Sequence, residues 1–397
     1  MTRRAHALTL TMALVWLGGP AAAAPSADDG VSLPVIPSAL TADASCTAGS
    51  SAVAKAVPWE QRSLGLTRVW RTAAGSKGGA GVTVAVVDTG VSPQAPALAE
   101  RVTTVGAAGS DCVGHGTFVA GLIAAAPAKN VRFAGVASKA RVLGVRGTDT
   151  RGTATAASVA SGIRAAARAG ADVVLVAPAL TGGSTELTAA VTYATDRDAL
   201  VVAAAAPDPA PGSGTASAPP PRDYWPAADP GVLSVLDLDA KGSRPSNAPA
   251  PLQADLTAPG DGVVGTGPSG KGHYLGSGAS LAAAYVAGTA ALVRAAHPGL
   301  SAGQTATRLV ETAYPSGIPR LDPYAAVTSV RDEEAAPATD STAEAAVRLD
   351  ADPSATAAGR RALAVASAGV AVGLGVAWAG AVLRLRRRRT ATLESEG

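Results

Sequence analysis

Short runs of aliphatic residues recur along the chain. The first, Val82–Val87, is almost entirely β-branched and leads into Asp88-Thr89-Gly90. Continuous apolar runs of this length are typical of strands that are buried on both faces of a sheet. Later segments repeat the pattern at Arg141–Val145, Asp172–Ala177, Leu200–Ala204, Val232–Leu236 and Asp255–Ala258.

Alanine-rich segments lie between several of these runs. The alternation predicts an α/β fold with a parallel central sheet and helices on both of its faces. The predicted helices are His115–Ala126, Ala156–Ala169, Leu187–Arg197 and Ser280–His297, the last ended by Pro298-Gly299. We assign residues 81–326 to this domain. Residues 207–222, rich in Pro, Gly, Ser and Ala, are expected to form a surface loop within it.

The amino-terminal end has the three parts of a secretory signal peptide. Arg3 and Arg4 supply the positive start, Ala7–Gly19 the apolar stretch, and Ala21–Ala24 the small residues at the cleavage site. The apolar stretch is too short to span a membrane comfortably, which argues against an anchor. We therefore predict a signal peptide at residues 1–24 and an irregular extension at residues 25–80.

A second apolar segment lies near the carboxyl-terminal end. Residues 363–383 carry no charge and would span about 30 Å as a helix, the thickness of a bilayer core. The arginine cluster after it predicts that the tail, residues 384–397, is cytoplasmic and the domain extracytoplasmic. The alternative is a buried helix of small residues. We expect a single-pass transmembrane helix, joined to the domain by a juxtamembrane linker at residues 327–362.

Charge and cysteine content narrow the classes of function. The net charge of +3 comes from the two ends of the chain, so nothing suggests nucleic-acid binding. The chain has two cysteines, Cys46 and Cys112. In an exported protein such a pair predicts a disulfide, with two free thiols as the alternative.

Three glycine-containing segments carry polar residues that could perform chemistry. Asp88 follows the first strand, and His115 and Ser280 each open a predicted helix. Serine hydrolysis needs a hydroxyl nucleophile, a base that takes its proton and a carboxylate that orients the base. Sites in parallel α/β sheets gather at the carboxyl ends of strands, where Asp88 falls. The segments are Val84–Gly90, Gly114–Gly121 and Gly278–Gly288.

Each of these residues has another interpretation when taken alone. Asp88 could be a turn residue, and Asp88-Thr89-Gly90 is also the tripeptide of aspartic proteases, but the sequence holds no second copy. His115 could bind a metal, but the chain has four histidines and no Cys/His cluster with metal spacing. Ser280 could be a helix N-cap. We predict neither a metal nor another cofactor.

In the order Asp88, His115, Ser280, the segments resemble the subtilisin family of serine proteases, whose catalytic residues run in that order. Three further features narrow the resemblance: Cys112 lies three residues before His115, Cys46 lies in the extension, and an apolar segment lies near the carboxyl-terminal end. They look like the mycosins, membrane-anchored subtilisin-like proteases associated with type VII secretion systems. The resemblance implies that Asp88, His115 and Ser280 are the charge-relay residues. It also implies a Cys46–Cys112 disulfide that ties the extension to the domain.

Three positions depart from the subtilisin pattern. Subtilisins carry an oxyanion-binding asparagine after a strand of the type Val-Val-Ala-Ala-Ala-Gly-Asn, and the aligned residue here is Pro207, which offers no donor. The neighbouring Asp208 would repel an oxyanion if it pointed inward. Pro178 lacks an N–H on the strand expected to pair with substrate. The motif Gly-Thr-Ser-x-Ala-Ala-Pro has become Gly278–Ala284, which keeps the serine.

These residues predict a membrane-anchored, extracytoplasmic serine endopeptidase that acts on a polypeptide. The resemblance to the mycosins implies that it is associated with a type VII secretion membrane complex. The loss at Pro207 predicts reduced turnover. The alternative is a catalytically inactive scaffold of the same complex, and a protease unrelated to secretion is a third interpretation. The extension could be a propeptide, but a disulfide to the domain would keep it attached.

Overall fold

The computed structural model describes residues 32–209, 219–244, 248–330, 378–380 and 382. The predicted signal peptide and cytoplasmic tail, and nearly all of the predicted linker and transmembrane helix, lie outside these residues. Among the described helices, one is long and apolar enough to cross a membrane, Ala279–Ala296, and 83% of its apolar span is buried within the fold. That helix therefore belongs to the core of the domain.

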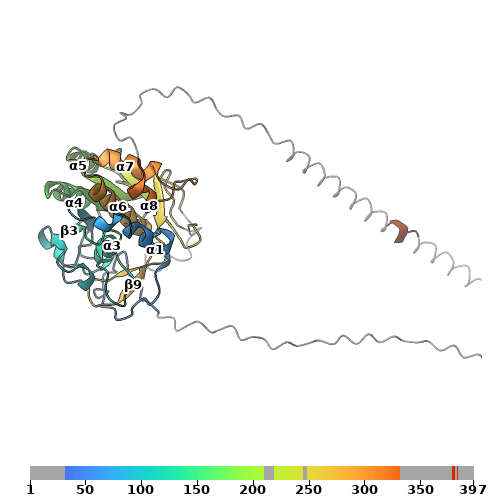
Figure 1. Ribbon diagram of the computed structural model, residues 1–397, viewed down its shortest axis with the longest axis horizontal. Coiled ribbons are helices and arrows are strands. Elements are labelled where there is room, and N and C mark those ends of the chain that lie inside the picture. Colours follow the sequence, from blue (N-terminus) through green and yellow to red (C-terminus); the bar gives the residue numbers. More distant parts are fainter. Residues whose placement is uncertain (1–31, 210–218, 245–247, 331–377, 381, 383–397) are drawn as a thin grey trace, which may run out of the picture. The chain divides into compact units, whose positions relative to one another are not determined.

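A seven-stranded parallel sheet forms the centre of the domain (Figure 1). Its strand order is β2-β3-β1-β4-β5-β6-β7, so β1 lies between β3 and β4. The predicted parallel sheet is confirmed. The sequence pattern misses β2, a three-residue edge strand that is not buried, and the antiparallel pair β8–β9, whose short strands contain glycine. The strands are β1 (Thr83–Asp88), β2 (Val102–Thr104), β3 (Arg141–Arg146), β4 (Val173–Val176), β5 (Leu200–Ala204), β6 (Val232–Leu238), β7 (Leu256–Pro259), β8 (Val263–Thr266) and β9 (His273–Gly276).

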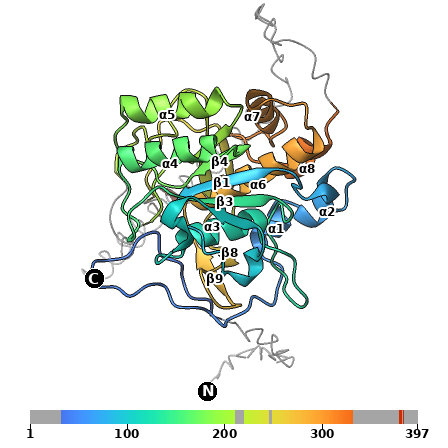
Figure 2. The same cartoon turned by 90° about the vertical axis from the view of Figure 1, so that its left-hand side faces the viewer.

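Helices cover both faces of the sheet (Figure 2). Helices α4 and α5 pack on one face, and α3 and α6 on the other. Alternate residues of a strand point to opposite faces. Val84 and Val86 of β1 therefore join the core under α3 and α6, whereas Ala85 and Val87 join the core under α4 and α5. This two-sided burial explains the uninterrupted apolar runs. The longer helices are α3 (His115–Ala124), α4 (Ala156–Arg168), α5 (Thr185–Thr195), α6 (Ala279–Ala296), α7 (Ala302–Glu311) and α8 (Pro323–Thr328).

The amino-terminal extension is more ordered than its sequence pattern indicates. The indole N–H of Trp59 donates to the carbonyl of Gly262 over 3.0 Å, and that of Trp70 to the carbonyl of Val136 over 2.9 Å. Each bond attaches the extension to a different segment of the domain. The short helices within residues 32–330 are α1 (Trp59–Ser63), α2 (Leu66–Trp70) and the 3-10 turns η1 (Gly75–Lys77), η2 (Pro96–Leu98) and η3 (Gly106–Gly109).

Candidate active site

Asp88 and His115 meet because a strand ends and a helix begins at the same edge of the sheet. Asp88 is the last residue of β1, and His115 is the first residue of α3. Nδ1 of the imidazole lies 2.8 Å from Oδ2 of Asp88. Both residues are buried, with 2% and 5% of their surface exposed, so water competes little for this contact. The carboxylate can therefore fix the orientation of the ring.

Ser280 approaches the same imidazole from α6, where it is the second residue. Its Oγ lies 3.2 Å from Nε2 of His115. Gly278 precedes the helix with a φ of 149°, and a Cβ there would lie 1.9 Å from Oδ1 of Asp208, so glycine is needed at this position. The structure thus brings Asp88, His115 and Ser280 into one hydrogen-bonded series.

A second buried carboxylate, Asp111, holds the start of α3 in place. Its Oδ1 accepts hydrogen bonds from Oγ1 of Thr89 and the N–H of Gly114, both over 2.8 Å. Its Oδ2 accepts from the N–H and the hydroxyl of Thr117, over 2.9 and 2.6 Å. Burial raises the pKa of the Asp111 carboxyl and outweighs these hydrogen bonds, which lower it. The sequence analysis did not identify Asp111. The only indication of its role in the sequence is its position just before the Gly114-His115 pair.

Cys46 and Cys112 form a disulfide in this structure. The extension also pairs with the same loop through Thr47, whose N–H donates to the carbonyl of Cys112 over 2.9 Å. The hydroxyl of Thr47 donates to the carbonyl of Val113 over 2.6 Å. The extension is therefore joined to the loop that leads into His115.

The carboxylate of Asp208 lies against both the serine and the histidine. Its Oδ2 accepts from the hydroxyl of Ser280 over 2.5 Å and lies 3.1 Å from Nε2 of His115. Its Oδ1 accepts from the backbone N–H of Ser280 over 3.0 Å. Asp208 thus contacts the nucleophile candidate at two atoms.

The residue that faces Ser280 after β5 is therefore Asp208 and not Pro207, which corrects the alignment made by counting residues from the strand. The chain continues along β6 beyond the end of β5, since the N–H of Ala205 donates to the carbonyl of Val235 over 2.8 Å. The side chain after β5 that contacts Ser280 is thus that of Asp208, one residue beyond Pro207. Pro207 only lines the cleft.

The two flanking carboxylates set the protonation of the imidazole. Burial by itself lowers the pKa of His115. The charges and hydrogen bonds of Asp88 and Asp208 outweigh that effect and hold the pKa well above its ordinary value of 6.5.

A cleft of about 250 Å³ opens beside these residues. His115, Asp208 and Pro178 contribute to its wall. Ser38 and Ala39 of the extension line it as well. The extension thus forms part of the surface that a substrate would meet.

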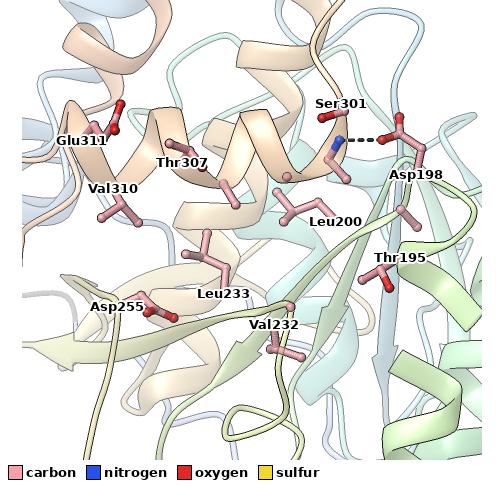
Figure 3. Close-up of a pocket in the computed structure, with 15 residues that line it drawn as sticks. Thr195, Asp198, Leu200, Val232, Leu233, Asp255, Ser301, Thr307, Val310 and Glu311 are labelled. Carbon is pink, nitrogen blue, oxygen red and sulfur yellow. Dashed lines mark hydrogen bonds between the residues drawn. The ribbon is translucent and has the colours of Figure 1, made fainter. Parts of the chain in front are cut away.

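A larger cavity, of about 710 Å³, lies elsewhere (Figure 3). Leu200 and Val232, the first residues of β5 and β6, line it, together with Asp198, which accepts from the N–H of Ala302 over 2.6 Å. It opens at the amino ends of these strands, whereas Asp88 and Asp208 follow the carboxyl ends of theirs. It is therefore not part of the cleft beside His115 and Asp208.

The fold and the comparisons with known proteins together identify the class of protein. Residues 79–369 match the Subtilase family, and the chain belongs to this family. It is accordingly a serine endopeptidase of the subtilisin type.

Within this family the chain is similar to the mycosins. It is 34% identical to Mycosin-4 of Mycobacterium tuberculosis over 346 residues, covering 75% of each protein. It is 32% identical to Mycosin-3 of the same organism over 390 residues, covering 79% of this chain and 81% of that protein. Thermitase of Thermoactinomyces vulgaris is 34% identical over 245 residues, covering 59% of this chain and 82% of that protein.

Solved structures point the same way. MycP1 from the ESX-1 type VII secretion system aligns with a TM-score of 0.62 at 26% identity, over 76% of this chain and 97% of that one. MycP3 protease from the ESX-3 type VII secretion system aligns with a TM-score of 0.62 at 30% identity, over 75% and 98%. The predicted resemblance to the mycosins is confirmed.

Proposed function

We propose that Ser280 is the nucleophile of this protease, His115 its general base and Asp88 the carboxylate that orients the base. The observation that carries this assignment is the series in which His115 lies 2.8 Å from Asp88 through Nδ1 and 3.2 Å from Ser280 through Nε2. Each separation is within hydrogen-bonding reach, as general-base catalysis requires.

The reaction follows from this geometry. Oγ of Ser280 attacks the carbonyl carbon of the scissile peptide while Nε2 of His115 takes its proton. The tetrahedral intermediate then expels the amine, which receives that proton, and an ester remains on Ser280. A water molecule, deprotonated by His115, hydrolyses the ester and restores the hydroxyl. Asp88 holds the ring so that Nδ1–H faces the carboxylate and Nε2 faces the serine.

Turnover is expected to be slow. An oxyanion needs preorganised donors, and loss of one costs subtilisin about 10²- to 10³-fold in turnover. Here the side chain that reaches Ser280 is the carboxylate of Asp208, which offers no donor to an oxyanion. The remaining donor is the backbone N–H of Ser280. Pro178 also removes one N–H from the edge that would pair with substrate.

The setting of the reaction is inferred from the sequence and from the relatives. MycP1 and MycP3 belong to type VII secretion systems. We infer that this chain serves a secretion complex of the same kind and cleaves a secreted polypeptide outside the cytoplasm. Residues 1–24 direct export, residues 363–383 anchor the chain, and residues 384–397 remain in the cytoplasm. The Cys46–Cys112 disulfide keeps residues 25–80 attached to the domain at 81–326.

A catalytically inactive scaffold is the second candidate function. It is favoured by one observation, the carboxylate of Asp208 within 3.0 Å of the Ser280 N–H and 2.5 Å of its hydroxyl. In a scaffold, Ser280→Ala leaves secretion intact while deletion of the gene abolishes it. In a protease, Ser280→Ala at normal protein level stops processing of the substrate.

Labelling with a fluorophosphonate probe tests the catalytic assignment. The wild-type chain is expected to be labelled and Ser280→Ala to remain unlabelled, because the probe bonds covalently to an activated serine. His115→Ala should also lose the label, since the base is then missing. A label that persists in folded Ser280→Ala contradicts the proposal, and so does the absence of label from every folded chain that carries Ser280.

A further inference from the structure

The carboxylate of Asp208 contacts all three polar groups that the first chemical step requires. Its Oδ2 accepts a hydrogen bond from the hydroxyl of Ser280, and its Oδ1 accepts one from the backbone N–H of Ser280. Oδ2 also lies 3.1 Å from Nε2 of His115. A substrate carbonyl has to use that same N–H, and the hydroxyl has to turn its hydrogen toward the imidazole. These contacts are made by one side chain that is itself 8% exposed.

We propose that Asp208 is a built-in block of the oxyanion site, and that this protease is held in a low-activity state by its own carboxylate. The proposal rests on the proposed roles of Ser280 and His115. It assigns a function to the side chain that stands against Ser280, where the subtilisin pattern expects an oxyanion-binding asparagine. Asp208 is not a catalytic residue in this proposal, because it opposes the reaction.

Two physical effects make the block. The oxyanion that forms on the substrate is negatively charged, and a carboxylate within hydrogen-bonding distance of the same N–H repels it. The hydroxyl of Ser280 donates to Asp208 at 2.5 Å and stands 3.2 Å from the imidazole, so its hydrogen is directed away from the base. Both effects disappear if the side chain at 208 is a neutral amide, whose NH₂ group can donate to the oxyanion.

The charges around Asp208 leave His115 as its ionic partner. Asp237 of β6 offers Asp208 no attraction, because its pKa is raised first by burial and also by the like charge of Asp208. Arg244 is engaged with Asp237, with its Nη2 and Nε each 3.0 Å from Oδ1. On the far side of the imidazole stands Asp88. Removing the charge of Asp208 therefore acts mainly on His115, whose pKa falls when one of its two carboxylates is lost.

The test uses the full chain in detergent and compares Asp208→Asn with Asp208→Ala. The rate of labelling by a fluorophosphonate probe is measured from pH 5 to pH 10. Asp208→Asn should react faster than Asp208→Ala by about 10²- to 10³-fold, the value of one oxyanion donor, and Asp208→Ala should still exceed the wild type. The acidic limb of the pH profile should move to lower pH in both variants. Asp196→Asn, an equal change of charge at the exposed end of α5, should match the wild type.

The outcomes separate this inference from the proposed function. If the wild type is labelled at Ser280 but neither variant reacts faster and the pH profiles coincide, the block is refuted and the catalytic assignment stands. If no variant gives Ser280-dependent label, both are refuted. If Asp208→Asn fails to fold, as judged by thermal unfolding, Asp208→Ala decides: a rate at or below that of the wild type overturns the block.

Discussion

The two sides of the site differ in the groups that they supply. One side, the β1–α3 half, consists of β1, helix α3 and the loop before α3; the other, the β5–α6 half, consists of β5, the residues after it and helix α6. Around His115, the loop and helix of the β1–α3 half supply donors to carboxylates, as the bonds of Asp111 to Thr89 and Thr117 show. Around Ser280, the β5–α6 half supplies a carboxylate where donors would be useful, because Asp208 accepts from both the hydroxyl and the N–H. The β1–α3 half orients the base, and the β5–α6 half engages the hydroxyl and the N–H of the nucleophile in hydrogen bonds.

The alignment of the catalytic residues and the ability of the site to stabilise the transition state are therefore separate properties. Distances of 2.8 and 3.2 Å align Asp88, His115 and Ser280. Stabilisation of the transition state depends in addition on donors aimed at the developing charge. Two aspartates touch the same imidazole, and their expected effects on rate have opposite signs.

The largest expected effect comes from the aspartate of the β1–α3 half. Asp88→Asn should lower the labelling rate by about 10⁴-fold, because an amide no longer holds the imidazole in the reactive tautomer. The rate is measured with the fluorophosphonate probe in the Asp208→Asn background, where the signal is strongest. The matched substitutions then differ only in which side of His115 they alter. If Asp88→Asn and Asp208→Asn change the rate in the same direction, the contrast between the two halves is wrong.

The next effect concerns how the extension is fixed to the β1–α3 half. The Cys46–Cys112 disulfide spans 66 residues of sequence. Its loss should lower the free energy of unfolding by about 4 kcal/mol, from the chain entropy that the closed loop removes from the unfolded state. Urea unfolding of the double variant Cys46→Ser, Cys112→Ser measures the change, and wild-type protein under reductant is the control. A change below about 1 kcal/mol would show that the contacts of Thr47 already hold the extension.

The smallest effect concerns how the extension is fixed to β8. Glu60 of α1 is fully buried, and its Oε1 accepts from the N–H of Val264 over 3.0 Å. Burial outweighs this bond and raises the pKa of Glu60 from 4.5 to about 7. The folded chain therefore binds a proton more tightly than the unfolded chain. The stability from this group is fully present below pH 4.5 and is lost as the pH rises through 7, by about 3 kcal/mol in all.

Glu60→Gln removes this titration and keeps an oxygen for the N–H of Val264. The variant should be more stable than the wild type at pH 8 and close to it at pH 4.5. Urea unfolding at the two pH values provides the comparison, and Glu186→Gln on the exposed start of α5 is the matched control. A wild-type stability that does not fall between these pH values relative to Glu60→Gln would contradict the buried, proton-binding role.

The sequence analysis predicted most of the longer elements and missed several that depend on contacts, but it also missed helix α7, although Ser301 caps it by accepting from the N–H of Gln304. The buried runs identified the main strands, because a strand covered on both faces has to be apolar throughout. Helix α5 begins at Thr185, two residues before the predicted start, since Ser184 caps it by accepting from the N–H of Leu187 over 3.1 Å. The five-residue helix α1 was missed because it is stabilised by packing on the domain and not by its own periodicity.

By itself, the sequence determined the fold class, the family and the identity of the three residues that meet at the imidazole of His115, because local motifs in a fixed order carry that information. Only the tertiary structure decided what surrounds them. Whether an aspartate after β5 faces solvent or Ser280 depends on where the chain leaves the sheet and on the space that Gly278 leaves open. Both are properties of segments about seventy residues apart, and no local pattern records them.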